Sequence, residues 1–482
     1  MHWRAILKIS GLLLMLFSLT MLTPLPFAWF YAEATGFAFV IAFALTFAAG
    51  LLAWAPVARS TEELRIREGF LITSIFYTGL GLFGALPLWL EAGAWASFTD
   101  ATFESFSGLT TTGATVATGL DGLPRSVLIY RQQLQWLGGM GIIILAIAIL
   151  PMLGVGGMQL YRTEMPGPVK DNKLTPRIAE TAKALWYIYL TLTAACAVAY
   201  WAAGMSAFDA LAHSFSTVAI GGFSTYDASI GHFDSAAIEI VGIVFMVLCG
   251  INFGLHFLVW NRRAPWLYLR DMEVRGYLTM LGSIGVLTVL LLILNDVVGW
   301  SDALRQGVFQ TVSIATTAGF ATTDFANWPG VLPFLVFFAA FTGACAGSTG
   351  GGLKVVRVQL IMRQGLREVR RLIHPHAVIP VKLGPSVVPN RVADAVWGFF
   401  SAWVIAFILM LMALLATGMD FLTAFSAVGA CLTNLGPGLG DVAAHYGDIS
   451  NPAKWVLCAA MLLGRLEIFT LLVLVTPAFW RG

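Results

Sequence analysis

Charged residues are scarce in this chain. Asp, Glu, Lys and Arg make up only 11% of its 482 residues, whereas 58% are apolar. A soluble domain usually has about 25% charged residues, so the composition argues against an ordinary soluble enzyme. The net charge of +2 says little about partners, and the distribution of the charges along the chain says more. Most of the protein surface must therefore face membrane lipid, and we expect no nucleic-acid partner.

Cysteine is scarce as well, and its pattern excludes two kinds of site. The five cysteines lie far apart, each in an apolar segment, at Cys196, Cys249, Cys345, Cys431 and Cys458. Because no CxxC motif or Cys/His cluster occurs, neither a disulfide framework nor a cysteine metal site is expected. We predict five buried thiols and no bound cofactor.

Long apolar runs are what the chain does contain. They begin near residues 6, 36, 70, 127, 184, 236, 277, 330, 394 and 453. The first follows the basic residues Arg4 and Lys8 and is too long for a cleaved signal peptide, so we interpret it as a membrane helix. At about 20 residues for each span, the pattern predicts an all-α integral membrane protein with about ten transmembrane helices.

Basic residues divide unequally between the loops on the two sides. If the N-terminus is cytoplasmic, the predicted cytoplasmic segments carry Arg59, Arg65, Arg67, Arg162, Lys170, Lys173, Arg177, Lys183, Arg262, Arg263, Arg270, Arg275, the stretch from Arg357 to Lys382, and Arg391. The predicted external segments carry only Arg125, Arg131, Arg305 and Lys454. This positive-inside bias predicts a multi-pass protein with both termini in the cytoplasm.

The predicted external loops are acidic. They contain Asp100, Asp121, Asp209, Asp227, Asp234, Asp302, Asp324, Asp420, Asp441 and Asp448. An acidic vestibule would raise the local concentration of cations. Any single one of these residues is also compatible with a solvated loop charge or a helix N-cap.

Four short, semi-polar segments of similar design lie between successive helix pairs. They read DATFESFSGLTTTGATVATG from Asp100, FDALAHSFSTVAIGGFSTYD from Phe208, RQGVFQTVSIATTAGFATTD from Arg305 and FLTAFSAVGACLTNLGPGLGD from Phe421. Each has about a dozen residues of amphipathic helical character, then small and hydroxyl residues, then a glycine. Alignment on that glycine pairs Gly113, Gly222, Gly319 and Gly436.

The helical part of each segment is too short to cross a hydrocarbon core of about 30 Å. It must dip into the membrane and return, and non-helical backbone at that depth must be buried or line water. Four such segments between spanning helices would converge on one axis and present backbone carbonyls to a cation. Glycine permits backbone angles that are closed to residues with a Cβ. The four segments therefore predict pore loops around one pore.

Two further features lie within apolar runs. The stretch FTGACAGSTGGGLK contains Gly343, Gly347, Gly350, Gly351 and Gly352, and it should interrupt its helix unless the glycines only permit close helix packing. Arg465 lies near mid-membrane, where a charge costs at least about 2.5–3.5 kcal/mol. It should face a cavity or a partner, and carbonyls of the interrupted helix are a candidate partner.

At these residues the sequence resembles the Trk/Ktr/HKT superfamily of potassium transporters, and within it the Trk-type membrane subunits. The stretches WLGGMGIIILAIAILPMLG, GPVKDNKLTPRIAETAKALWYIYL and GSTGGGLKVVRV are very similar to that subfamily. The resemblance implies an N-terminal helix pair at 1–68 and four helix–pore-loop–helix repeats at 69–160, 161–265, 266–375 and 376–482. It also implies potassium as the transported substrate, in the inner membrane of a bacterium.

The resemblance assigns the selectivity filter residue by residue. Its carbonyls would come from Thr111, Thr112, Gly113, Ile220, Gly221, Gly222, Thr317, Ala318, Gly319, Asn434, Leu435 and Gly436. In the superfamily a serine at a filter glycine accompanies sodium transport, so four glycines favour potassium. Pro437 after the fourth glycine departs from the pattern of the other three strands.

The resemblance also implies a gate and partners. The glycine-rich interruption, together with Lys354, would occlude the pore beneath the filter, and Arg465 would add an electrostatic barrier there. The family implies a homodimer docked on a cytosolic, nucleotide-binding TrkA-like ring. The basic stretch from Arg363 to Arg371 is a candidate contact, although attraction to anionic lipid headgroups explains it equally well.

Three other functions remain as alternatives. A sodium-selective or weakly selective relative of the same superfamily is the nearest. An intramembrane aspartyl protease would use the YD and GxGD motifs at Asp227 and Asp441, but both fall in predicted external loops. A secondary transporter with inverted repeats requires antiparallel halves, whereas these four repeats share one orientation.

Overall fold

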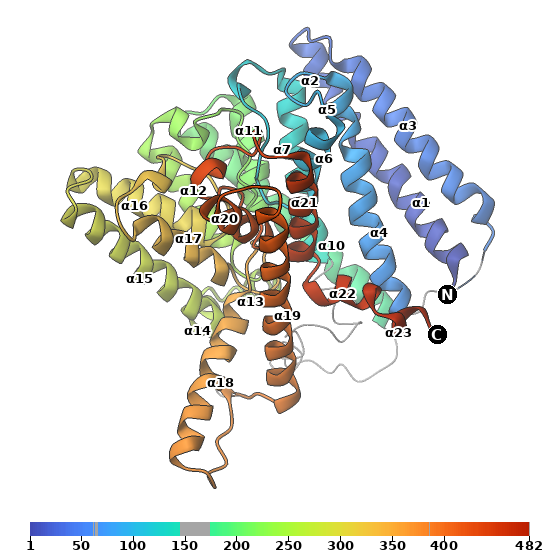
Figure 1. Ribbon diagram of the computed structural model, residues 1–482. Coiled ribbons are helices and arrows are strands. Elements are labelled where there is room, and N and C mark those ends of the chain that lie inside the picture. Colours follow the sequence, from blue (N-terminus) through green and yellow to red (C-terminus); the bar gives the residue numbers. More distant parts are fainter. Residues whose placement is uncertain (61, 63–65, 145–173, 385, 482) are drawn as a thin grey trace.

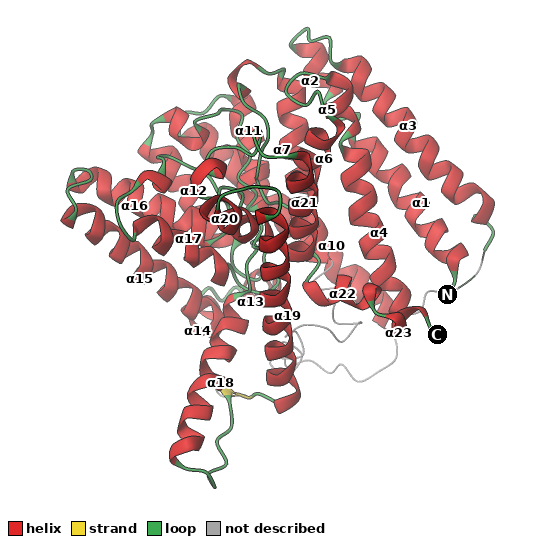
Figure 2. Cartoon of the chain, viewed as in Figure 1, coloured by secondary structure: helices red, strands yellow, loops and turns green. Residues whose placement is uncertain are grey.

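The computed structural model describes the chain except for residues 61, 63–65, 145–173, 385 and 482. The described residues form a helical bundle with one small hairpin, in which β1 (Lys382–Leu383) pairs antiparallel with β2 (Ser386–Val387) (Figure 2). The boundary expected between residues 160 and 161 lies outside the described residues, as do Arg65, Arg162, Lys170 and Lys173. The predicted all-α class is confirmed.

An N-terminal helix pair flanks the bundle (Figure 1). Its first span contains α1 (Trp3–Thr20) and α2 (Leu25–Phe30), and its second contains α3 (Gly36–Trp54) and η1 (Ala55–Val57). Glycines allow α1 and α3 to touch, because a Cβ on Gly11 would lie 2.7 Å from the carbonyl oxygen of Gly50. Small residues permit such close approach of membrane helices.

The rest of the chain repeats one helix order four times. The first repeat contains α4 (Ile66–Gly84), α5 (Leu86–Glu91), α6 (Phe98–Leu109), η2 (Leu120–Gly122) and α7 (Arg125–Ile144). The second contains α10 (Leu174–Ala202), α11 (Ala207–Ala219), η4 (Ser229–Phe233), α12 (Ala236–Cys249), α13 (Phe253–Arg262) and α14 (Trp266–Arg270).

The last two repeats follow the same order. The third contains α15 (Met272–Leu294), α16 (Trp300–Ala315), η5 (Phe325–Asn327), α17 (Leu332–Thr342) and α18 (Val355–Ile373). The fourth contains α19 (Asn390–Leu415), α20 (Phe421–Leu432), η6 (Gly440–Val442), α21 (Asn451–Arg465), α22 (Ile468–Val475) and α23 (Pro477–Trp480).

The predicted short pore helices are α6, α11, α16 and α20. They have 12, 13, 16 and 12 residues, or about 18 to 24 Å at 1.5 Å per residue. The side chains of Ser97, Ser206 and Asp420 accept backbone N–H groups at the starts of α6, α11 and α20, which satisfies donors that a helix start leaves free. Each helix ends at a predicted filter strand.

The expected spans are present, but several are broken. Among the described residues, six helices are long and apolar enough to cross a membrane, and two bent pairs raise the number to eight. The remaining two apolar runs correspond to α7 and to α17, which the glycine-rich stretch ends after 11 residues. The predicted interruption of the third repeat is therefore present.

Two bends were not predicted. Helices α12 and α13 meet at 92°, and α21 and α22 meet at 114°. At the first bend the Asn252 side chain accepts the N–H groups of Gly254 and Leu255, which starts a new helix. At the second, Glu467 has a φ of 60° and cannot continue α21. The sequence analysis treated both runs as continuous helices.

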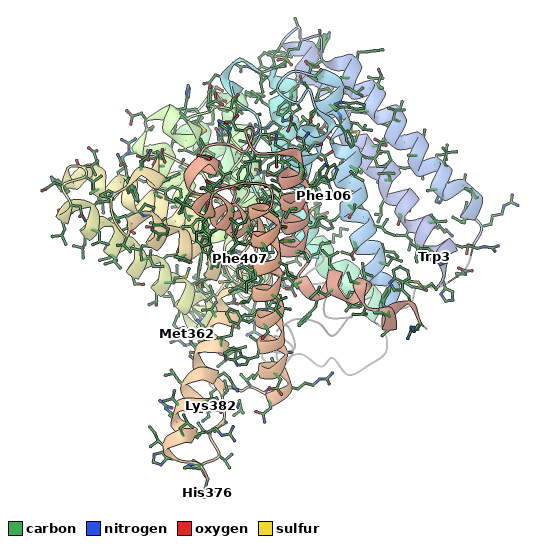
Figure 3. All side chains as sticks on the ribbon, in the orientation of Figure 1. Trp3, Phe106, Met362, His376, Lys382 and Phe407 are labelled. Carbon is green, nitrogen blue, oxygen red and sulfur yellow. The ribbon has the colours of Figure 1, made fainter. Side chains whose placement is uncertain are left out.

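Both described chain ends lie on the same side of the bundle (Figure 1). The rings of Trp3 and Trp480 stack there with centroids 6.5 Å apart. On that side α18 and the start of α19 project from the bundle, and Figure 3 shows His376 at the tip of the projection. The five cysteines are buried and free, as expected.

Candidate functional site

The four predicted filter strands share one backbone conformation. The aligned glycines have positive φ angles of 82°, 80°, 78° and 100°, at Gly113, Gly222, Gly319 and Gly436. The residues two positions earlier also have positive φ angles, at Thr111, Ile220, Thr317 and Asn434. Such angles are uncommon outside glycine. Their recurrence at matching positions shows that the four segments are built alike.

The four strands close into a ring. A Cβ built on Gly113 would overlap the carbonyl oxygen of Gly221, and one on Gly222 would overlap that of Ala318. The same relationship joins Gly319 to Leu435, and Gly436 to Thr112. Each glycine thus lies against the carbonyl that precedes the glycine of the next repeat, and the fourth repeat returns to the first.

This ring brings together all twelve residues that the sequence assigned to the filter. The first and fourth strands are also joined by a hydrogen bond of 3.0 Å from the Asn434 amide to the Thr112 hydroxyl. The Asn434 amide donates a second hydrogen bond to the carbonyl of Met461 in α21. The Asn434 side chain therefore ties the first and fourth strands to α21.

Two side chains that the sequence analysis did not single out bind filter carbonyls. The Gln135 amide in α7 donates to the carbonyl of Gly221 at 2.5 Å, and its oxygen accepts the N–H of Phe223. The Tyr446 hydroxyl donates to the carbonyl of Gly436 at 2.7 Å. A carbonyl oxygen has two lone pairs, so each keeps one for another partner. The four strands thus share one backbone conformation but differ in the side chains that bind their carbonyls.

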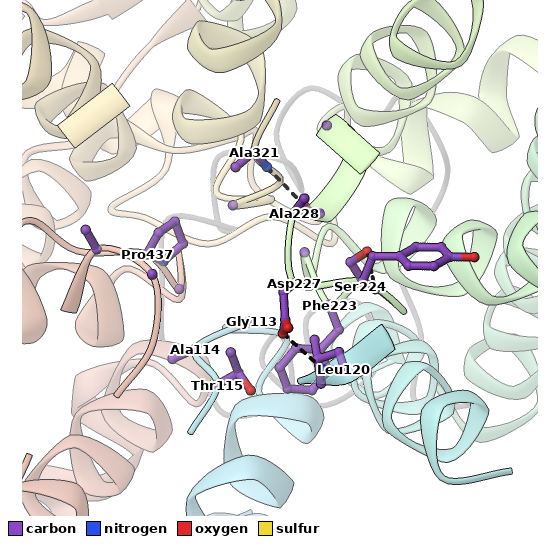
Figure 4. Close-up of a pocket in the computed structure, with 18 of the residues that line it drawn as sticks. Gly113, Ala114, Thr115, Leu120, Phe223, Ser224, Asp227, Ala228, Ala321 and Pro437 are labelled. Atoms are coloured by element: carbon purple, nitrogen blue, oxygen red, sulfur yellow. Dashed lines mark hydrogen bonds between the residues drawn. The ribbon is translucent and has the colours of Figure 1, made fainter. Parts of the chain in front are cut away.

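A cavity of ≈ 410 Å³ opens above the ring (Figure 4). The four aligned glycines line this cavity, and so do Asp227 and Asp324. The Asp227 carboxylate also accepts the N–H groups of Gly119 and Leu120, at 2.8 and 3.1 Å. Two of the aspartates that the sequence analysis placed in an acidic vestibule therefore line this cavity.

Other expected vestibule charges have local structural partners. Asp100 pairs with Lys454 at 2.6 Å, and buried Asp209 accepts the hydroxyl of Thr225. The sequence analysis counted Arg131 among the external charges but did not predict that it is part of a helix. Arg131 lies within α7 with 1% of its side chain exposed, because it pairs with Glu104 of α6.

The glycine-rich interruption forms a loop, residues 343–354, directly against the inner side of the ring. The N–H of Gly351 donates to the Thr317 hydroxyl at 2.6 Å, and the N–H of Gly352 donates to the Thr433 carbonyl at 2.9 Å. The Thr349 hydroxyl donates to the carbonyl of Val218 at 2.9 Å. The loop therefore contacts the second, third and fourth repeats where their pore helices end.

Three glycines let this loop fold so tightly. Gly343, Gly347 and Gly352 have φ angles of 71°, 72° and 77°, which residues with a Cβ rarely adopt. A Cβ on Gly351 would overlap the Thr433 carbonyl. The glycines predicted to break the helix thus also allow the loop to approach the filter strands.

Two cations lie at this loop. Buried Arg465 donates to the carbonyl of Thr349 at 2.9 Å and to that of Gly138 at 3.1 Å. The Lys354 ammonium donates to the carbonyl of Gly350. The expected contact of Arg465 with carbonyls of the interrupted helix is therefore present. Glu467, two residues on, pairs instead with Arg357 at 2.6 Å.

The arrangement combines two chemical properties along one axis. A ring of backbone carbonyls replaces water around a desolvated cation. The loop 343–354 packs next to this ring, the basic side chains of Arg465 and Lys354 lie at the loop, and positive charge repels a cation.

Comparison with known proteins agrees with this geometry. Residues 35–481 match the family model described as "Cation transport protein" (TrkH). The chain is 60% identical to a Trk system potassium uptake protein TrkH of Halomonas elongata, over the full length of both chains. It is 40% identical to TrkG of Escherichia coli K12, covering 100% of this chain and 99% of the other.

A solved structure agrees as well. The crystal structure of the potassium transporter TrkH from Vibrio parahaemolyticus matches with a TM-score of 0.93 and 54% identity, covering 100% of both chains. The multi-pass helical architecture, the four pore segments and the extent of these matches lead to one conclusion. The chain belongs to the TrkH family of cation transport proteins.

Proposed function

We propose that this protein takes up potassium across a bacterial inner membrane through the ring of filter strands. The observation that carries the proposal is the closure of that ring, in which each filter glycine lies against a carbonyl of the next repeat. The names of the relatives support it, because they are Trk system potassium uptake proteins. We infer transport rather than catalysis, since Asp227 and Asp441, the aspartates of the protease alternative, lie in separate loops near the vestibule.

The proposal divides the chain into the N-terminal pair, residues 1–68, and the repeats 69–160, 161–265, 266–375 and 376–482. It places both termini in the cytoplasm, together with the projection formed by α18 and α19. Basic residues support this orientation, because Arg363, Arg367, Arg370 and Arg371 all lie on α18. The acidic vestibule would then face the outside.

We further propose that the loop 343–354 and Arg465 form the gate. The loop packs against the ring, and a shift of α17 or α18 would break its hydrogen bonds to Thr317, Thr433 and Val218 together. Arg465 and Lys354 place positive charge next to it. We therefore interpret this arrangement as a closed pore.

Ion competition separates potassium uptake from the sodium-selective alternative. Purified protein in liposomes should take up rubidium or potassium, and potassium should compete for this uptake more effectively than sodium. Replacement of Gly222 or Gly319 by serine should reduce that preference, because a Cβ at either position overlaps a carbonyl of the ring. Gly282→Ser is the matched control, since a Cβ there meets no atom within 4 Å.

The competition experiment has clear opposing outcomes. Equal competition by sodium in the unaltered protein would favour the weakly selective alternative, which the four glycines argue against. Wild-type selectivity in both Gly222→Ser and Gly319→Ser, at normal expression, would contradict the filter assignment.

We also propose a homodimer that docks on a cytosolic, nucleotide-binding TrkA-like ring, and the word "system" in the relatives' names supports a partner. The exposed apolar residues Leu366, Val369 and Leu372 on α18 favour protein contact over lipid alone. Replacement of these three residues by serine should abolish co-purification of the ring from a matched host. Retained co-purification would place the contact elsewhere.

A further inference from the structure

One position of the pore helices is polar and fully buried in three of the four repeats. It lies nine residues before the filter glycine and is occupied by Glu104, His213, Gln310 and Ala427. The side chains of Glu104, His213 and Gln310 have 0% exposure. Buried polar groups are costly unless they are hydrogen-bonded, so their partners show what they do.

All three polar residues bind the chain just after the filter glycine of their own repeat. Nε2 of His213 lies 2.9 Å from the Ser224 hydroxyl, and the Gln310 amide donates to the Thr323 carbonyl at 2.9 Å. Glu104 accepts the N–H of Val116 at 3.0 Å and the Thr115 hydroxyl at 2.9 Å. This position therefore fixes the outer end of each of these filter strands.

In the fourth repeat, the residue at the adjacent position binds the segment after the filter glycine. Ala427 cannot form a hydrogen bond through its side chain, but the neighbouring Ser426 hydroxyl donates to the Leu439 carbonyl at 2.9 Å and accepts the Leu439 N–H at 2.8 Å. In every repeat, a side chain of the pore helix thus forms a hydrogen bond to the segment that follows the filter glycine. We call each of these contacts a strap.

Only the first strap carries a charge, and a second repeat shares it. Nε and Nη2 of Arg131 donate to one oxygen of Glu104 at 2.8 and 2.6 Å. The remaining Nη1 donates to the carbonyl of Ser224 in the second repeat at 3.1 Å. The guanidinium carbon also lies 4.3 Å from the ring centroid of Phe223, which follows the second filter glycine.

We propose that the Glu104–Arg131 pair is a positioning element that sets the spacing of the first and second filter strands and so contributes to ion selection. The inference rests on the proposed filter. The planar guanidinium holds its partners in a fixed direction, and charge-assisted hydrogen bonds are stronger than neutral ones. Ser224 is consequently held on two sides, through its carbonyl by Arg131 and through its hydroxyl by His213.

Glu104 is not placed to bind a cation itself. Both of its oxygens are occupied, one by Arg131 and Thr115 and the other by Val116 and Thr115. Its side chain is fully buried behind the strand. Its effect on ions must therefore act through the position of the strands.

The test compares potassium and sodium competition in Glu104→Gln with that in a matched control. Glu239→Gln is the control, because Glu239 is also buried and paired with an arginine, Arg305 at 2.7 Å, but touches no filter strand. We expect Glu104→Gln to lower the potassium-to-sodium preference by about fivefold or more, while Glu239→Gln keeps the wild-type ratio. A folded Glu104→Gln protein with wild-type preference would overturn the proposal, and so would an equal fall in Glu239→Gln.

Milder variants decide the matter if Glu104→Gln does not fold. Thr115→Val removes one hydroxyl from the strap, and Arg131→Lys keeps the charge but loses the forked contact that reaches Ser224. Each should lower the preference by about twofold, and wild-type values in both would overturn the proposal. If Gly222→Ser changes selectivity and the strap variants do not, only this inference fails. If none of them does, the filter assignment itself fails.

Discussion

The guanidinium of Arg465 donates a hydrogen bond of 2.9 Å to the carbonyl oxygen of Thr349, 116 residues earlier in the chain. Arg465 is the last residue of α21 in the fourth repeat, whereas Thr349 lies in the loop of the third. The same guanidinium reaches Gly138 of the first repeat. One cation therefore joins three repeats immediately below the filter strands.

Removal of this cation should increase conduction. Two unit charges 4 Å apart repel by about 4 kcal/mol at an effective dielectric constant of 20, and a reduction of about 1.4 kcal/mol in a barrier raises a rate tenfold. We expect Arg465→Ala to raise rubidium flux into liposomes by about tenfold or more, without a regulatory ring. Arg465→Lys should be intermediate, because lysine keeps the charge but loses the planar fork.

Arg371→Ala provides the control for this comparison, since Arg371 is half exposed on the projecting helix α18. Its flux should equal that of the unaltered protein. If Arg465→Ala is monodisperse and conducts no better than wild type, the arginine is a structural link between repeats and not a barrier.

Crowding of the loop should also open the pore. A Cβ at Gly351 would overlap the carbonyl of Thr433, so Gly351→Ala must displace the loop from the filter strands. We expect a severalfold rise in flux with unchanged ion preference, and a larger rise when Gly350 to Gly352 are deleted. Gly365→Ala on α18 is the control, because its Cβ would meet no atom within 4 Å. Unchanged flux in folded Gly351→Ala would assign the loop to packing alone.

The Asp100–Lys454 pair should contribute to stability. It joins α6 of the first repeat to α21 of the fourth at 2.6 Å, and the Lys454 side chain is only 4% exposed. Lys454→Met should lower the free energy of unfolding by about 1–3 kcal/mol, because Asp100 loses its partner. The exposed Glu368–Arg371 pair is the comparison. Arg371→Met should change the free energy of unfolding by less than about 0.5 kcal/mol. Thermal unfolding in detergent measures both, and equal melting temperatures would contradict the prediction.

The N-terminal helix pair should be separable from ion selection. A Cβ on Gly50 would lie 2.8 Å from the Gly11 carbonyl, so Gly50→Val must push α1 and α3 apart at a cost of about 1–3 kcal/mol. We expect a lower melting temperature but a wild-type preference for potassium over sodium. Gly79→Val in α4, where a Cβ meets no atom within 4 Å, controls for the valine itself. A changed ion preference in Gly50→Val would link the pair to the pore.

The four matching strands of the ring could be located from the sequence because their requirement is a backbone property. Positive φ angles restrict the residue type, so the glycines at positions 113, 222, 319 and 436 left a visible pattern. The short pore helices were predictable because their amphipathic segments are too short to cross the membrane. A partner for Arg465 was predictable because an unpaired charge at mid-membrane is costly.

The bends and the charged strap could not be predicted in the same way. The runs around Asn252 and Glu467 are apolar enough to be taken as single spans, and only the capping potential of Asn252 marked a break. Arg131 was assigned by its side of the membrane, a rule that treats each charge alone. Its partner Glu104 lies on another helix, 27 residues away, so the pair emerges only when α6 and α7 pack together. The sequence did offer one signal for this pair, because Glu104 lies at the same position in its repeat as His213 and Gln310 do in theirs.

The four repeats occupy one chain, and this has a consequence for how the pore can evolve. A channel made of four identical subunits would repeat each side chain around the axis, so one arginine below its filter would become a ring of four mutually repelling charges. Here the guanidinium of Arg465 meets the carbonyls of Thr349 and Gly138 in other repeats instead of copies of itself. Because the four repeats belong to a single polypeptide, each repeat can mutate separately. The third repeat can therefore supply the loop with Thr349, and the fourth can supply the arginine that binds it.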